Sequence, residues 1–424
     1  MKVLIATDAF PPVCGGSGWS TYELARGLRT RGHEIDVVQA RPQSTPVHET
    51  EQRASYDGFD VTLFTFRAST LPFLRNVDKS ERLTDRLSTW LAARVRANRH
   101  DIVHAQHVMT TAPSIEAAKA VGVPVVATVR DYWPVCYWSD LLHTRAGLAL
   151  CPACTVGNMT RCIQPRAGAA WPLAVPLIPY MRANLARKQR TLADADAVIA
   201  VSRRIADDLR VRAAGLHATR IDVIPNPVNV SALRALASSS AAAVATPAAA
   251  YALYLGKLAP NKGTEFLVPA IERADLDWPL VVVGDGPDRG TLEQDAAASG
   301  RDVRFTGWVD KAAAAHWLAH ASMLIFPSRG PESLSRVLIE ASALGIPIAA
   351  MDTGGTRDII DPGVTGLLSS SPDGLAEDIR TLRHDDALRA RLGAAAARRI
   401  EAEFEAGAVV ARVEALYAEL VAHR

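Results

Sequence analysis

The chain has 424 residues, of which 49% are hydrophobic and 22% are charged, and its formal net charge is +2. This length exceeds one ordinary hydrophobic core, so we expect two domains, and no nucleic-acid partner is expected. The charge is uneven, with +8 in residues 1–190 and −6 in residues 191–424. The basic half favours an anionic partner or an anionic membrane surface, and chance solvation explains it equally well.

In the first half, apolar strand-like runs alternate with helical segments. The predicted strands are residues 2–7, 34–39, 102–105, 123–129 and 197–201. This alternation is typical of an α/β fold with a doubly wound parallel sheet. The apolar run 3–6 is too short for a signal peptide and continues as a strand, so we expect a cytoplasmic protein.

A glycine turn with Gly15, Gly16 and Gly18 follows the first strand, and a helix is predicted to begin near Thr21. The turn lacks the G-x-G-x-x-G spacing of dinucleotide-binding proteins, and Gln39 and the residue after it stand where those proteins carry an acid. A nicotinamide cofactor is therefore not expected. Glycine here permits the backbone to approach a ligand closely.

Four cysteines fall within a Trp-rich insertion near residues 131–165, namely Cys136, Cys151, Cys154 and Cys162. Four thiols with one C-x-x-C pair could hold a structural zinc, although the spacing of the second pair departs from that of zinc ribbons. Reduced, packed cysteines and a disulfide within the insertion are the alternatives, and a cytoplasmic location disfavours the disulfide.

The most apolar stretch, residues 167–181, is too short and too rich in proline to cross a bilayer. It is followed by Arg182, Arg187, Lys188 and Arg190. Such a segment can lie on a membrane surface, and packing against the rest of its domain is an equally good interpretation.

After a small-residue linker at 238–250, a second set of strands begins at Tyr251. Lys257 and Lys262 come directly after the first of these strands, and Gly284 ends the second. Because open α/β sheets bind ligands at the carboxyl ends of their strands, the two lysines are placed to meet a diphosphate. A single lysine after a strand is more often a solvated charge.

Two glutamates, Glu332 and Glu340, stand eight positions apart across a predicted helix start. At about 100° per residue they would point about 80° apart on one continuous helix, so Glu332 fits better on the preceding loop, beside N–H groups that attract phosphate. Glu340 lies among apolar residues, where a carboxylate needs donors such as sugar hydroxyls. The alternative is one exposed glutamate and one held by nearby backbone.

Together these motifs resemble the retaining, nucleotide-sugar-dependent glycosyltransferases of family 4. The resemblance rests on residues 1–16, 101–104, 223–229 and 256–263 and on the glutamate pair, and it covers nearly the whole chain. It implies the GT-B fold, with two doubly wound Rossmann-like domains facing a central cleft. Residues 1–228 would form the acceptor-side domain, residues 229–398 the nucleotide-sugar-binding domain, and residues 399–424 a helix that returns to the first domain.

The resemblance also implies an activity, a hexosyl or related transfer of EC 2.4 type. A sugar would move from a UDP-, GDP- or similar nucleotide donor to a glycan, a glycolipid or another hydroxyl acceptor in cell-surface polysaccharide or glycoconjugate synthesis. Catalysis would need no metal or other cofactor. The expected location is the cytoplasm, with the inner face of the membrane as a place of peripheral attachment.

Site residues carry over by position. The resemblance assigns catalysis to Gln106, His107, Lys262 and Glu332. It assigns donor binding to Gly15, Gly16, Lys257, Lys262, Gly284, Gly307, Trp308, Val309, Glu332, Ser333, Leu334, Ser335 and Glu340. It assigns the acceptor side to Arg130, Asp131 and Tyr132.

Three positions depart from the common pattern of the family. Gln106 stands where many members carry a histidine, and His107 follows it. Lys257 stands where arginine is commoner. Arg130 stands where histidine is frequent, and its fixed positive charge could select an anionic acceptor. These departures leave a second hypothesis, a nucleotide-sugar-binding protein without turnover. Lys262 retained together with both glutamates favours the enzyme.

Overall fold

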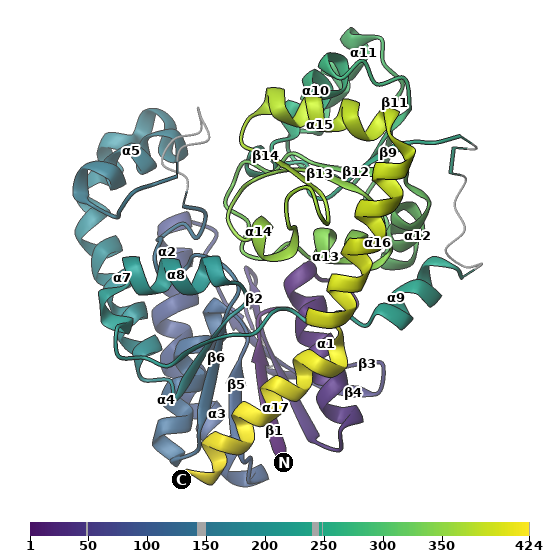
Figure 1. Cartoon of the computed structure of the whole chain (residues 1–424). Coiled ribbons are helices and arrows are strands. Elements are labelled where there is room, and N and C mark those ends of the chain that lie inside the picture. Colours follow the sequence, from purple (N-terminus) through teal and green to yellow (C-terminus); the bar gives the residue numbers. More distant parts are fainter. Residues whose placement is uncertain (48–49, 142–149, 240–245, 248, 424) are drawn as a thin grey trace. The chain divides into compact units, whose positions relative to one another are not determined.

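The computed structural model describes residues 1–47, 50–141, 150–239, 246–247 and 249–423, and it divides into two compact units (Figure 1). Unit 1 consists of residues 1–139, 153–227 and 409–424. Unit 2 consists of residues 140–152 and 228–408. Most of the predicted linker at 238–250, namely 240–245 and 248, lies outside the described residues.

Unit 1 is built on a sheet of eight strands in the order β3-β4-β2-β1-β5-β6-β7-β8. All neighbouring strands run parallel except β3, which is antiparallel to β4. The strands are β1 (Lys2–Thr7), β2 (Glu34–Gln43), β3 (Glu51–Tyr56), β4 (Phe59–Arg67), β5 (Ile102–Ala105), β6 (Val125–Val129), β7 (Ala197–Ala200) and β8 (Ile221–Val223).

The five predicted strands of this half are present, with ends shifted by up to four residues, whereas β3, β4 and β8 were not predicted. β3 is largely exposed at the edge of the sheet, so its sequence carries no apolar alternation. β4 is buried at most positions and shows the apolar run typical of an interior strand.

The helices of this part of the chain are α1 (Gly16–Thr30), α2 (Pro72–Val77), α3 (Leu83–Asn98), α4 (Val108–Val121), α5 (Val156–Ala167), α6 (Trp171–Ala174), α7 (Ile178–Ala193), α8 (Arg203–Arg212) and α17 (Ala406–Ala422). α1 begins five residues before the predicted start at Thr21. Its first turn contains Gly16 and Gly18, which disfavour helix in isolation. Gly18 is needed there because a Cβ would lie 2.7 Å from the sulfur of Cys14.

The core of unit 1 includes a helix from the far end of the chain. Val409, Val410, Val413, Leu416 and Tyr417 of α17 are buried in the same apolar cluster as β1, β4 and α1. α1 and α17 pack so closely that a Cβ at Gly27 would lie 2.5 Å from Val410. The last helix is therefore an integral part of this core.

Unit 2 is built on a six-stranded parallel sheet in the order β11-β10-β9-β12-β13-β14. The strands are β9 (Ala252–Leu255), β10 (Leu280–Val283), β11 (Val303–Gly307), β12 (Met323–Phe326), β13 (Ile348–Met351) and β14 (Leu367–Ser369). The helices are α9 (Val230–Ala237), α10 (Leu267–Arg273), α11 (Arg289–Ser299), α12 (Lys311–His320), α13 (Arg336–Ala343), α14 (Thr356–Ile359), α15 (Pro372–His384) and α16 (Asp386–Glu403).

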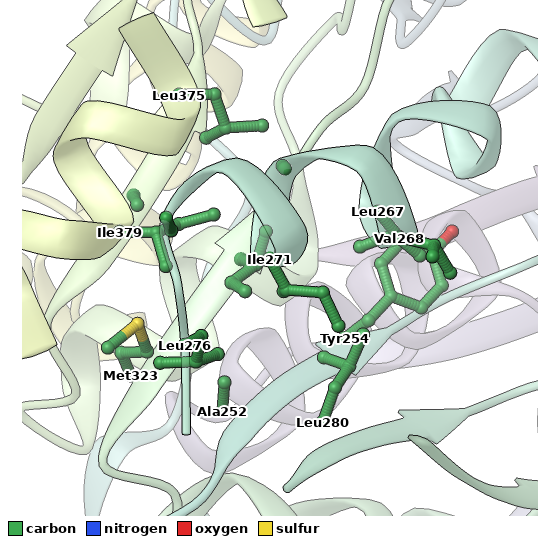
Figure 2. Packing of buried hydrophobic residues seen from close by; sticks show 14 of the residues in the cluster. Ala252, Tyr254, Leu267, Val268, Ile271, Leu276, Leu280, Met323, Leu375 and Ile379 are labelled. Atoms are coloured by element: carbon green, nitrogen blue, oxygen red, sulfur yellow. The ribbon is translucent and has the colours of Figure 1, made fainter. Parts of the chain in front are cut away.

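Figure 2 shows how helices cover one face of this sheet. Leu267 and Ile271 of α10 and Leu375 and Ile379 of α15 lie in one apolar cluster with Tyr254 of β9. Each buried aliphatic side chain contributes about 1.5–3 kcal/mol relative to exposure. The cluster holds the strands rigidly, and with them the loops at their carboxyl ends.

The predicted terminal helix at 399–424 is interrupted, because α16 ends at Glu403 and α17 begins at Ala406, which is a correction. The break falls at Phe404 and Glu405. There the N–H of Val228 donates to the carbonyl of Phe404 over 3.0 Å, and the N–H of Ala406 donates to the carbonyl of Val228 over 2.9 Å. These bonds replace helical ones, which is why the helical periodicity of the sequence does not reveal the break.

Candidate functional site

In unit 1, polar side chains gather where three neighbouring parallel strands end. Asp8 follows β1, Gln106 and His107 follow β5, and Arg130 follows β6. These strands are adjacent in the sheet, so their carboxyl ends meet at one edge. Asp8 was not predicted as a site residue, although its place directly after a buried strand is the same signal that identified the two lysines of unit 2.

His107 forms the N-terminal cap position of α4 and joins it to the end of β1. Its Nδ1 lies 2.9 Å from Oγ1 of Thr7 and 3.3 Å from the N–H of Asp8. Burial, and secondarily the charge of Arg130, lowers the pKa of His107 to about 3. The ring is therefore neutral at physiological pH. Its Nε2 is buried and has no hydrogen-bond partner within the described ranges.

The guanidinium of Arg130 lies between two amide side chains. It donates to Oδ1 of Asn226 and to Oε1 of Gln106, and all three residues are buried. Nε2 of Gln106 finds no acceptor in the part of the chain that the structure describes. Arg130 thus fixes the amide of Gln106 with its N–H₂ group available, and this link between Arg130 and Asn226 was not predicted.

Burial raises the pKa of two aspartates near these strand ends, Asp8 and Asp131. Asp8 accepts the N–H groups of Met109 and Thr110, at 3.0 and 3.2 Å, at the start of α4. Burial nevertheless raises the pKa of Asp8 to about 7. Asp131 accepts the N–H of Trp133 over 2.8 Å, and burial raises its pKa to about 6. Both groups therefore titrate closer to neutrality than an ordinary aspartate.

Asp131 and Tyr132 were predicted on the acceptor side; Asp131 is half-buried, whereas Tyr132 lies in the interior. Tyr132 is only 2% exposed, so its side chain packs within the unit. Burial lowers the pKa of Lys188, which the charge of Asp131 partly offsets. The carboxylate of Asp131 therefore has a buried cation in its electrostatic field.

A buried histidine ties the last helix to this region. Nδ1 of His104 lies 2.5 Å from the hydroxyl of Tyr417 in α17, and its Nε2 lies 2.7 Å from Oγ1 of Thr128 in β6. Burial, and secondarily the charge of Arg130, lowers the pKa of His104 to about 3. His104 is a neutral structural bridge two residues before Gln106.

In unit 2, Lys262 and Glu332 form an ion pair. Nζ of Lys262 lies 2.7 Å from Oε1 of Glu332, and Oγ of Ser328 donates to the same oxygen over 2.5 Å. The side chain of Lys262 is 31% exposed and that of Glu332 is 10% exposed. The structure thus brings together two residues that the sequence assigned to one site, and it adds Ser328, which was not predicted.

Glycines hold the loops around this pair in contact. Gly263, at φ +66°, approaches Pro327 so closely that a Cβ would lie 2.0 Å from its carbonyl oxygen. Gly354, at φ +55°, approaches Glu332 in the same way, since a Cβ at this position would lie 2.1 Å from the carbonyl oxygen of Glu332. The N–H of Gly355 donates to that carbonyl over 2.6 Å. The loops after β9, β12 and β13 therefore interlock around the ion pair, and no larger residue would fit at either glycine.

Glu340 is mostly buried, as predicted, but cations of unit 2 hold its carboxylate. Nε of Arg336, one turn earlier on α13, lies 2.7 Å from Oε1, and Nζ of Lys311 lies 3.9 Å from the same atom. The side chain is 14% exposed. α13 begins at Arg336, with Ser335 as its cap residue, so Ser333 and Leu334 belong to the loop before the helix and do not supply helical N–H donors. That placement corrects the predicted helix start.

The other predicted donor residues of unit 2 lie at the ends of strands or on the loops that follow them. Lys257 is exposed, and no carboxylate within the described ranges lies at ion-pair distance from it. Gly284 packs against the backbone of Gly256, and Gly307 has φ +73°. Trp308 is 72% exposed and Val309 is half-buried. In unit 1, Gly15 and Gly16 are exposed at the N-terminus of α1.

The cysteine insertion lies partly outside the described residues, at 142–149. Cys136, Cys151 and Cys162 are buried, and the sulfur of Cys154 donates to the carbonyl of Val135 over 3.7 Å. Among the described residues, no group of three or more His, Cys, Asp or Glu side chains is arranged to hold a metal ion. The structural zinc stays a prediction, which metal analysis of the reduced protein can test.

Comparison with known proteins identifies the chain. A family model described as Glycosyltransferase Family 4 matches residues 14–232, and one described as Glycosyl transferases group 1 matches residues 249–385. The first match alone covers just over half of the chain. The chain belongs to glycosyltransferase family 4. It is accordingly an enzyme of EC 2.4 type, as the sequence predicted.

Relatives of this glycosyltransferase span its whole length. It is 27% identical over 407 residues to a D-inositol 3-phosphate glycosyltransferase of Xylanimonas cellulosilytica, covering 90% of this chain and 86% of the relative. Among solved structures, sucrose-phosphate synthase of Thermosynechococcus elongatus matches with a TM-score of 0.68 at 20% identity, covering 100% of both chains. HepE of Anabaena, solved with UDP-glucose, matches with a TM-score of 0.64 at 17% identity, covering 99% of this chain and 100% of HepE.

These likenesses confirm the predicted GT-B fold, with two Rossmann-like α/β domains. Glycosyltransferase activity in the synthesis of polysaccharides or glycoconjugates is likewise confirmed at the level of class. No described helix is both long and apolar enough to span a membrane.

Proposed function

We propose that this glycosyltransferase transfers a hexose or related sugar from a nucleotide-sugar donor to a hydroxyl of a glycan or lipid-linked acceptor, with retention of anomeric configuration. The observation that carries the proposal is the ion pair of Lys262 and Glu332 on loops that glycines hold in contact. It combines a cation for the leaving diphosphate with a carboxylate for sugar hydroxyls. HepE, solved with UDP-glucose, supports a uridine nucleotide as the donor, and a guanosine nucleotide is the alternative.

The chemistry follows from the charges of unit 2. The bond between the anomeric carbon and the β-phosphate oxygen breaks, and the negative charge of the leaving nucleoside diphosphate grows. The ammonium groups of Lys262 and Lys257 stabilise that charge without a divalent metal. The acceptor oxygen bonds to the anomeric carbon on the face that the diphosphate leaves, and its proton passes to a β-phosphate oxygen. Glu332 orients the sugar by accepting from its hydroxyls.

Glu340 completes the donor part of the proposal. Arg336 and Lys311 both lie against Oε1 and hold the carboxylate in one orientation, so Oε2 can accept from the hydroxyls of a ribose. Trp308, which is 72% exposed, supplies an aromatic face for the base. Different residues are thus assigned to the two parts of the donor: Glu340 and Trp308 to the nucleoside, and Glu332 to the sugar.

In unit 1, the proposed role is hydrogen bonding to hydroxyl groups. Nε2 of Gln106 and Nε2 of His107 are buried polar atoms without a partner in the described part of the chain. An unpaired buried donor costs about 1–3 kcal/mol, which a ligand hydroxyl would recover. The positive charge of Arg130 favours an acceptor that carries an anionic group. The relative from Xylanimonas, by its name, uses such an acceptor, an inositol phosphate.

A donor panel tests the proposal without knowledge of the acceptor. The purified protein is titrated calorimetrically with UDP- and GDP-linked sugars, and the sugar released by slow transfer to water is followed by proton NMR immediately after mixing. We expect one nucleotide class to bind and the first released sugar to have the anomeric configuration of the donor. Release in the opposite configuration would overturn retention. Absence of binding to every donor would overturn the donor site.

A further inference from the structure

Helices α5, α6 and α7 form a helical layer of unit 1 with a small core of its own. Met159 and Ile163 of α5 and Ile178 and Met181 of α7 are buried together, and Trp171 of α6 packs against them. Figure 1 shows α5 beyond one end of α7. The layer contributes none of the polar residues gathered at the ends of β1 and β5, so the proposed chemistry does not account for it.

The outer side of this layer carries apolar side chains at exposed positions, where polar side chains are usual. A groove of about 660 Å³ is lined by Val156 of α5, by Val175 and Pro176, and by Pro179, Arg182 and Ala183 of α7. Val156, in this lining, is 51% exposed, and Leu173 of α6, two residues before Val175, is 83% exposed. Clustered exposed apolar side chains of this kind mark a surface that is covered in use.

The charge of the same segment is one-sided. Residues 151–193 contain six Arg and Lys residues and no Asp or Glu, so this segment supplies most of the +8 carried by residues 1–190. Arg187 is paired with Glu81 at 2.5 Å, whereas Arg161, Arg182 and Arg190 are exposed. Arg182 stands at the groove itself, where its charge borders the apolar lining.

We propose that the outer face of α5, α6 and α7 docks on an anionic phospholipid bilayer. Leu173 and Val156 enter the interface between headgroups and acyl chains, and Arg161, Arg182 and Arg190 meet lipid phosphates. An apolar face bordered by basic side chains is the arrangement that binds anionic membranes from the side. A second copy of the chain is disfavoured as the occupant, because a symmetric contact would bring two sets of these cations together.

This inference deepens the proposed function at one point. If the protein transfers sugar as proposed, docking on the membrane favours an acceptor held in the membrane. This choice of acceptor rests on the proposed function. Docking itself does not, because it is measured without donor or acceptor.

Vesicle co-sedimentation of the full chain tests the docking face. Vesicles of phosphatidylcholine alone are compared with vesicles that also contain phosphatidylglycerol, at low and high salt. We expect binding to the anionic vesicles that weakens as salt rises. Arg182→Glu should lower the partition coefficient roughly tenfold, since each basic residue near such a surface contributes about 1 kcal/mol. Leu173→Glu should lower it by about tenfold as well, through lost apolar burial.

Two matched variants of unit 1 serve as controls. Val211→Glu changes an apolar residue of α8 that is 81% exposed, and Arg53→Glu changes an exposed cation of β3. Both should bind vesicles like the wild type. Docking is overturned if the wild type does not bind anionic vesicles, or if the control variants lose as much binding as Arg182→Glu and Leu173→Glu. It is also overturned if sedimentation shows a dimer that Leu173→Glu dissociates. Leu173→Glu should keep wild-type donor affinity, so failure of the donor panel and failure of docking are read separately.

Discussion

The two polar groups at strand ends, one in each unit, balance their charges in different ways. In unit 1, Asp8 and His107 are partly buried and form no ion pair that the structure describes, and burial shifts the pKa of Asp8 to about 7 and that of His107 to about 3. In unit 2, Lys262 and Glu332 neutralise each other at 2.7 Å. Burial alone favours neutral forms, whereas a close partner preserves the charged ones.

This difference assigns different capabilities to the two groups. The neutral imidazole of His107 and the amide of Gln106 can exchange hydrogen bonds with hydroxyl groups. The ammonium of Lys262 can stabilise a developing negative charge. The predictions below test that division from the largest expected effect to the smallest.

The largest effect is expected at Lys262. Lys262→Ala should lower the turnover rate about 100-fold or more, because a cation aimed at a leaving diphosphate contributes on the order of 3 kcal/mol to the transition state. Steady-state kinetics at saturating donor measure the loss. Lys257→Arg, which keeps the charge on an exposed side chain, should retain most activity. Wild-type turnover in Lys262→Ala would show that the phosphate assignment is wrong.

Asp8 should give unit 1 a pH response. Its folded pKa of about 7 lies above the ordinary value of 3.8, so the folded state binds more protons between these values. Stability is therefore lost as pH rises from about 4 to 7 and levels off above 7. Asp8→Asn should lack this loss and become more stable than the wild type above pH 7, by up to about 3 kcal/mol after discounting partial exposure.

Urea unfolding at a series of pH values measures the difference between Asp8→Asn and the wild type. The background from Asp131, whose pKa is raised to about 6, is common to both proteins and cancels in the comparison. Parallel pH profiles for the two proteins would contradict the assignment of this response to Asp8.

The two glutamates should separate nucleotide from sugar. Glu340→Gln should weaken binding of the bare nucleoside diphosphate, and Glu332→Gln should chiefly weaken binding of the intact sugar nucleotide. Each lost charged hydrogen bond is worth roughly 1.5–3 kcal/mol, or about 10- to 100-fold in affinity. Calorimetry of both variants against both ligands measures the pattern. If either change unfolds the protein, or neither alters any affinity, the glutamates are structural.

Tyr417→Phe should cost stability and little else. It leaves Nδ1 of His104 buried without its partner, at a cost of about 1–2 kcal/mol in the free energy of unfolding. Tyr56→Phe is the control, because its hydroxyl makes no hydrogen bond that the structure describes, and it should change stability by less than about 0.5 kcal/mol. Equal destabilisation by both variants, in chemical unfolding, would refute the bridge.

The sequence predicted what local pattern encodes. Buried strands of the sheets are apolar runs between turns, and the charges that follow them mark the ligand edge. The resemblance to family 4 then assigned Lys262 and Glu332 to one site before their contact was known. β3 escaped prediction because an exposed edge strand has no apolar alternation, and the true start of α1 escaped because Gly16 and Gly18 disfavour a helix out of context.

Contacts between residues distant in sequence could not be predicted. Asn226 meets Arg130 across 96 positions, and Tyr417 meets His104 across 313. Neither pair has a local signature, and the pKa shift of Asp8 depends on burial by elements that only the fold brings together. The sequence therefore anticipated the contacts among polar residues in unit 2 more completely than those in unit 1.

The place of α17 in the core of unit 1 also determines when that unit can finish folding during synthesis. The first 227 residues leave the ribosome before residues 228–408 of unit 2, and the apolar surface that Val410 and Tyr417 cover stays open until α17 has been made. Nascent unit 1 therefore exposes an apolar surface throughout the synthesis of residues 228–408, and such surfaces are prone to aggregate. A ribosome that stops before residue 409 would release a protein whose second unit is complete and whose first unit is not.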